Sequence, residues 1–114
     1  MKTVIVQKDN KKLLHLTLSK NWYDKIKNGK KKVEYREYKD YWKSRIIGKD
    51  FTHILFRCGY SVKYQLLIAE IKKIYCLESG IFTDLRIEAP VFCIQFDNVE
   101  IYHRKVINIK EGIK

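Results

Sequence analysis

The chain has 114 residues, of which 46% are hydrophobic and 13% aromatic; this suffices for one domain with a modest core and argues against a disordered chain. No apolar run reaches about 18 residues, the length that a membrane-spanning helix requires, and the N-terminal stretch at residues 1–8 is too short and too quickly charged to be a secretory signal. The net charge is +11, and +9 of it falls in residues 1–50. Such a basic half favours an anionic partner, although a solvated lysine surface would account for the same charge.

The first half of the chain predicts strands alternating with short helices. Residues 13–18 are mostly apolar and predict a strand, and the alternation at 32–38 predicts another. Between them, residues 20–28 predict a helix in which Asn21 is a candidate N-cap and Gly29 ends the helix. Trp22 and Ile26 would share its apolar face.

A second helix is expected at residues 40–47, with Asp40 as a candidate cap and Gly48 as the stop. The side chains expected on its apolar face are Trp42, Ile46 and, beside them, Tyr41.

The second half of the chain predicts mainly strands. They are expected at 52–57, before a turn at Gly59, at 64–75 with a bend, at 91–96 after Pro90, and at 99–106 beyond a hairpin turn at Asp97-Asn98. Because strands outnumber helices, a closed or nearly closed barrel is favoured. Residues 1–114 contain no Pro/Gly-rich linker, so we expect a single α+β domain, a small mixed β-barrel with two short helices.

The cysteines and histidines are scattered. The odd number of cysteines and the absence of a CxxC pair argue against a disulfide framework and favour reduced thiols in the cytoplasm. No histidine pair has a metal-ligand spacing, so we expect neither a metal nor an organic cofactor, and surface or packing roles for these rings. The residues are Cys58, Cys76, Cys93, His15, His53 and His103.

One motif lies between the first predicted helix and the next strand. The pattern G-x-K-x-x-E-x-R is matched by Gly29, Lys31, Glu34 and Arg36. With a predicted strand and helix before this motif, the chain resembles the ASCH family of PUA-like domains over about residues 12–107. Residues 41–45 and 56–60 are also similar to segments of small members of that family. The resemblance implies a PUA-like barrel that binds RNA or a nucleotide-like small molecule.

The motif chemistry suits an anionic or nucleobase ligand. Lys31 offers an ammonium for a phosphate, while Glu34 and Arg36 lie two residues apart and therefore share one strand face. In a regular strand Lys31 would point the other way, so it must lie in the preceding turn if the three converge. Arg57 and Tyr60, from the next strand and turn, are expected to line the same cleft.

Basic and aromatic residues alternate around the motif, as they do in proteins that bind single-stranded nucleic acid. Lys20 and Trp22 are therefore further candidate ligand contacts. The aromatic residues of this region are Trp22, Tyr23, Tyr35, Tyr38, Tyr41, Trp42 and Tyr60. Packing alone is the alternative role for these rings, and Glu34 with Arg36 could equally form a structural ion pair that closes the barrel mouth.

The resemblance also implies an enzymatic alternative. Some small bacterial members hydrolyse the amide of N-acylated cytidines with the motif lysine, a threonine and a later glutamate. The lysine is Lys31, whereas the threonine position holds Glu34, which could activate a water while Lys31 polarises the carbonyl or protonates the leaving amine. The later glutamate would be Glu70 or Glu78. Ribonuclease activity is a weaker family-implied option, and a structural module without a ligand is a third class; the oligomeric state stays open.

Overall fold

The structure, a computed structural model, describes residues 10–103. In this part of the chain the elements are β1 (Leu13–Leu18), α1 (Lys20–Lys27), β2 (Val33–Glu37), α2 (Asp40–Ile46), β3 (His53–Cys58), β4 (Leu67–Leu77) and β5 (Val91–Ile101). The strands form one sheet in the order β1-β3-β4-β5-β2. Neighbours are antiparallel except β1 and β3, which are parallel. The predicted α+β class with two short helices is confirmed.

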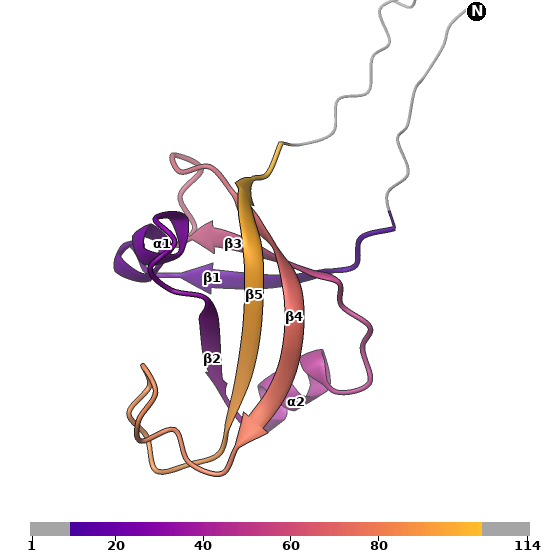
Figure 1. Cartoon of the computed structure of the whole chain (residues 1–114), viewed down its shortest axis with the longest axis vertical. Helices are drawn as coiled ribbons and strands as arrows, with labels where there is room; N and C mark the ends of the chain where they lie inside the picture. The colour runs from indigo at the N-terminus through magenta and orange to yellow at the C-terminus, as the bar shows by residue number, and fades with distance from the viewer. Residues whose placement is uncertain (1–9, 104–114) are drawn as a thin grey trace, which may run out of the picture.

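The sheet curls into a half-barrel with β1 and β2 as its edge strands (Figure 1). Its longest strands, β4 and β5, run side by side for eleven residues each. Their pairing shifts register between Ile68 and Glu70 and again between Ile71 and Lys73, and such bulges bend a strand and increase its twist. The bend expected in this strand is thus present. The expected barrel is open between β1 and β2, and this opening determines where the cleft lies.

The core follows from alternation in the central strands. Leucines at every second position of β1 face apolar residues of β3 that pair beside them. The two sets are Leu14, Leu16 and Leu18, and Ile54, Phe56 and Cys58. Helix α1 adds Tyr23 and Ile26, both almost fully buried. The Tyr23 hydroxyl donates a hydrogen bond to the Gln65 carbonyl at 2.5 Å, which satisfies its one polar atom.

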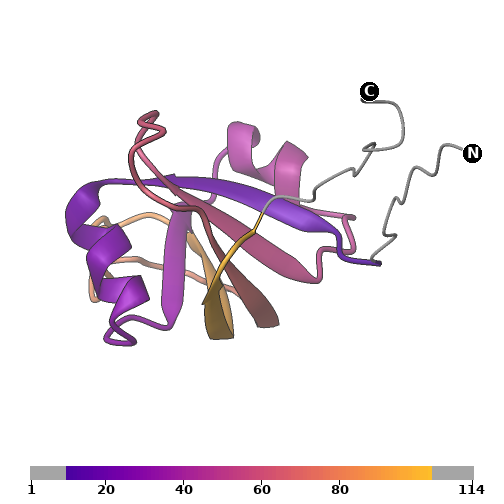
Figure 2. The same ribbon diagram turned by 90° about the horizontal axis from the view of Figure 1, so that it is seen from above.

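The helices are short, eight and seven residues, and lie well apart from each other (Figure 2). Gly29 and Gly48, at φ +76° and +75°, end them as predicted. The predicted caps are wrong by one or two residues, because Ser19 precedes α1 and Lys39 precedes α2. β1 ends at Leu18 and the helix begins almost at once, so Asn21 is already inside its first turn. Between residues 10 and 103 the structure contains no helix with the length and apolarity needed to cross a bilayer.

The predicted hairpin turn at Asp97-Asn98 is wrong. Both residues lie within the continuous strand β5, which begins directly after Pro90 as expected. Asn98 has φ +55° and lies at the irregularity of the β4–β5 ladder, where its side-chain amide donates to Glu70 at 3.0 Å. Asp97 and Asn98 form a bulge in place of the predicted turn, because β5 pairs with β4 on both sides of them. The part of the expected return strand beyond residue 103 lies outside the described residues.

Truncating Ile26 tests how firmly α1 is attached to the core. Ile26 has no exposed surface, so Ile26→Ala should lower the free energy of unfolding by about 2–5 kcal/mol through lost burial and a cavity. Ile47→Ala, at a side chain that is 53% exposed, is the matched control and should change it by less than about 1 kcal/mol. Chemical denaturation measures both; equal losses would contradict this account of the core.

Candidate functional site

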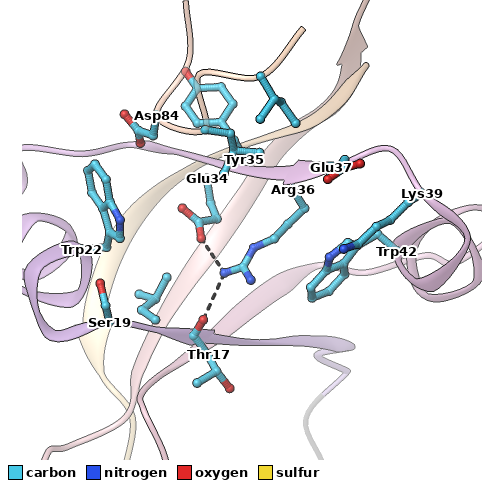
Figure 3. Close-up of a pocket in the computed structure, with 13 residues that line it drawn as sticks. Thr17, Ser19, Trp22, Glu34, Tyr35, Arg36, Glu37, Lys39, Trp42 and Asp84 are labelled. Carbon is cyan, nitrogen blue, oxygen red and sulfur yellow. Dashed lines mark hydrogen bonds and ion pairs between the residues drawn. The ribbon is translucent and has the colours of Figure 1, made fainter. Parts of the chain in front are cut away.

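A cleft of about 490 Å³ lies at the opening of the half-barrel, between the two edge strands (Figure 3). One wall is formed by residues 17–19, where β1 ends and α1 follows, and the other is β2 at residues 34–37. Each helix contributes one indole, Trp22 from α1 and Trp42 from α2. The loop between β4 and β5 closes one end with Asp84 and two apolar neighbours. The site therefore collects residues from across the chain.

Four charged side chains of alternating sign form a connected row at this cleft. Glu34 is at its centre, with one carboxylate oxygen 3.2 Å from Lys31 Nζ and the other 2.5 Å from Arg36 Nη2. Lys31 Nζ also contacts the Asp84 carboxylate. Lys31 and Glu34 are only 8% and 7% exposed, so each buried charge has its opposite beside it, as burial requires. The row is neutral as a whole.

The convergence of Lys31 with Glu34 depends on how α1 ends. Gly29 takes the left-handed backbone conformation, and the amides of Lys30 and Lys31 both donate to the Lys25 carbonyl, at 2.9 and 3.1 Å. The chain therefore turns sharply, and Lys31 lies before β2 starts at Val33. The expected position of Lys31 in this turn is confirmed.

Arg36 joins the two edge strands across the opening. Its Nη2 donates to the Thr17 carbonyl of β1 at 3.2 Å as well as to Glu34 (Figure 3). Its Nε is buried and has no hydrogen-bond partner among the described residues. The Arg36 side chain thus links β1 and β2, which are not paired through their backbones. Within the part of the chain that the structure describes, its Nε–H remains a buried donor without an acceptor.

Aromatic rings flank both cations. Lys31 Nζ lies 5.0 Å from the ring centroids of Trp22 and Tyr35, and Arg36 Cζ lies 5.0 Å from that of Trp42, within the range of cation–π attraction. Trp22 and Trp42 lie on opposite sides of the Glu34–Arg36 pair (Figure 3). Burial raises the pKa of the Tyr35 phenol. Both indoles pack against the core, and both also line the cleft.

Four of the sequence-predicted contacts do not line this cleft. Lys31 is joined to it through Glu34 but lines a neighbouring hollow, and the other three lie farther away. Arg57 lines a separate hollow of about 180 Å³ with His15, because β3 pairs on the inner side of the edge strand β1 and Arg57 alternates with Phe56 and Cys58, which face the core. Tyr60 is 86% exposed beyond the end of β3. Lys20 is exposed and pairs with Asp24 at 2.7 Å. The motif residues and Trp22 converge, whereas the residues chosen from the next strand and turn do not.

The acidic side chain that a later segment of the chain brings to the cleft is that of Asp84. Neither Glu70 nor Glu78 lines the cleft; Glu70 lies on β4 and is bound by Asn98 and Lys72, and the hydrogen bond from Asn98 in particular lowers its carboxyl pKa. Asp84 lies in a loop without any periodic pattern, which is why the sequence did not indicate it.

The loop that carries Asp84 is held by a short internal bridge. Gly80 pairs with Ile87, and the Thr83 hydroxyl donates to the Gly80 carbonyl at 2.7 Å. A Cβ on Gly80 would lie 2.5 Å from a methyl of Val91, so only glycine fits there. These contacts place Asp84 over Lys31.

Within residues 10–103 the structure brings together no group of three or more potential metal ligands. Comparison of the chain with protein-family models, with curated proteins and with solved structures found no match.

Neutralising the central carboxylate should destabilise the protein. Glu34→Gln leaves Arg36 without a carboxylate and Lys31 with Asp84 alone, so the free energy of unfolding should fall by about 3 kcal/mol. Glu70→Gln removes a carboxylate from an exposed pair and should have little effect. Urea denaturation of both variants at neutral pH measures the difference. Indistinguishable losses would show that the row of charges is not structurally important.

Proposed function

We propose that the protein binds a nucleobase-containing ligand, a nucleotide or an unpaired nucleotide of RNA, in the cleft between β1 and β2. The observation that supports this most directly is the pair of indoles on opposite sides of the Glu34–Arg36 ion pair (Figure 3). Aromatic faces stack on bases of any sequence, and a carboxylate beside a guanidinium can accept and donate hydrogen bonds at a base edge. The cleft volume is that of a typical small-molecule site.

The charge balance of the cleft favours a neutral group over a phosphate. Lys31 and Arg36 are offset by Glu34 and Asp84, which they contact. The ammonium of Lys31 is therefore already bound by two carboxylates, and the role first expected for it, a free phosphate contact, is not the one we propose. A base, which is uncharged and rich in donors and acceptors, fits such a site better.

The unpaired donor of Arg36 supports the same proposal. A buried N–H without an acceptor costs free energy, and a carbonyl oxygen of a bound base would accept from it. The motif resemblance to ASCH-type, PUA-like domains agrees with a nucleic-acid or nucleotide ligand. A purely structural role for the Glu34–Arg36 pair is less well supported, because the Arg36 side chain keeps 18% of its surface exposed and the pair lines the cleft.

Removing one indole tests the stacking role. Trp42→Ala should weaken binding of the preferred ribonucleoside about tenfold, since a base–aromatic stack contributes about 1–3 kcal/mol. Tyr60→Ala, which removes an exposed ring outside the cleft, should leave the affinity unchanged. Titration of each variant with the four ribonucleosides, followed by calorimetry, gives the comparison. Equal affinities for the two variants would place the ligand elsewhere.

Amide hydrolysis of N-acylated cytidine is the second candidate, and the position of Asp84 favours it. Both oxygens of Glu34 face cations, whereas Asp84 contacts Lys31 through one oxygen and its side chain is 34% exposed. Asp84 is thus better placed than Glu34 to accept a proton from water. The hydroxide would add to the acyl carbon, the C–N bond would break, and Lys31 would protonate the departing amine and recover its proton through Asp84.

Release of cytidine from a panel of N-acylated cytidines tests this second function. If the protein is this hydrolase, turnover should disappear in Lys31→Ala and fall at least about a hundredfold in Asp84→Asn, while Glu78→Gln should retain it. No release of cytidine at high protein concentration would reject hydrolysis and leave binding as the function to pursue.

A further inference from the structure

A second hollow, of about 310 Å³, adjoins the cleft on the side of α1. Its walls carry the lysines of the α1–β2 turn and of the last turn of α1, and we call it the lysine hollow. Its charged residues are Lys25, Lys30, Lys31, Lys32 and Asp84. It shares Trp22, Tyr35 and Asp84 with the cleft, so one ligand could contact both.

Three of the four ammonium groups in the lysine hollow have little or no compensation from acidic groups. Lys31 is held by Glu34 and Asp84. Lys32 lies 3.8 Å from Asp97 in an exposed pair, which contributes little, and Lys30 forms no ion pair within the described residues. Lys25 lies over the Trp22 ring at 4.6 Å, where a cation keeps its charge available to an anion.

Two backbone amides of the α1–β2 turn are not available to an anion here. The amides of Lys30 and Lys31 already donate hydrogen bonds to the Lys25 carbonyl. The hollow also lies at the C-terminal end of α1, and the partial negative charge at that end of a helix repels anions. An anion in the hollow would therefore be held by mobile ammonium groups, which bind phosphate oxygens as point charges and do not require one fixed geometry. Close positive charges also repel each other, and a phosphate would relieve that repulsion.

We infer that the lysine hollow is the phosphate subsite of the ligand whose base enters the cleft. This inference rests on the proposed function, and it assigns the ligand to phosphorylated nucleotides, with Lys25, Lys30 and Lys32 binding the phosphate. The neutral row of charges then separates two chemistries, an aromatic cleft for the base and a basic hollow for the phosphate. The phosphate is either the monoester of a free nucleotide or a diester of an RNA backbone.

The test compares nucleosides with their phosphorylated forms. The full-length protein is titrated with the four ribonucleosides, their 5′-monophosphates and a six-nucleotide single-stranded RNA, at several salt concentrations. The monophosphate of the preferred base should bind about tenfold more tightly than its nucleoside. The triple variant Lys25→Gln/Lys30→Gln/Lys32→Gln should lose this advantage, so that it binds the monophosphate no more tightly than it binds the nucleoside.

A matched control separates the subsite from the general charge of the protein. Lys49→Gln/Lys63→Gln/Lys73→Gln removes three exposed lysines outside both hollows and should keep the advantage of the monophosphate. The salt slope of RNA binding should fall in the first variant by about one for each lysine that no longer binds a phosphate. If the triple variant does not fold, as judged by its thermal transition, Lys30→Gln replaces it, because that side chain is exposed and unpaired in the described structure.

Failure of the subsite and failure of the proposed function give different results. Equal affinity for nucleoside and monophosphate, or equal loss in the two lysine variants, would overturn the subsite while the cleft remains the base site. Absence of nucleoside, nucleotide and RNA binding would overturn both. RNA binding that exceeds monophosphate binding and has the steeper salt slope would identify the diester as the phosphate, and the reverse would identify the monoester.

Discussion

The carboxylate of Glu34 is the group on which the arrangement of the site depends. It is buried at the opening of the half-barrel, and a buried charge is tolerated only where opposite charges lie beside it. Lys31 and Arg36 are those charges, one from the turn after α1 and one from β2 itself. Through Arg36 the carboxylate is linked to the carbonyl of Thr17 on β1, and through Lys31 to the loop that carries Asp84. One carboxylate thus ties together segments that the sheet leaves unpaired.

This row of charges explains why the barrel is open and why the opening forms a cleft. A ladder of backbone hydrogen bonds between β1 and β2 would close the sheet and remove the space between them. Side-chain charges bridge the same distance while leaving a cleft of about 490 Å³ with an indole on each side. The bridge is neutral, whereas four lysines of the N-terminal half lie next to it, in the lysine hollow.

Much of this could be predicted from the sequence wherever the signal was local. The leucines of β1, the glycines that end the two helices and the spacing of Glu34 and Arg36 are properties of a few neighbouring residues, and they agree with the structure. Arg57 and Tyr60 were misplaced because chain order does not reveal that β1 is the edge strand and that β3 lies one strand farther from the opening. Asp84 was missed because its loop has no periodicity, and Asp97-Asn98 was misread because pairing with β4 outweighs a turn propensity. The identity of the ligand remains a proposal that rests on the chemistry of the cleft and on the motif resemblance.

The most direct test of the central claim is to map where a ribonucleoside 5′-monophosphate binds. Two-dimensional NMR of the isotopically labelled protein, recorded during titration with the monophosphates of the four common bases, reports the shift of each backbone amide. The account predicts that the largest shifts occur at residues 17–19 and 34–37, on the two walls of the cleft, with smaller ones at residues 30–32. Shifts confined to other surfaces, or no shifts at millimolar concentrations of any of the four, would contradict it.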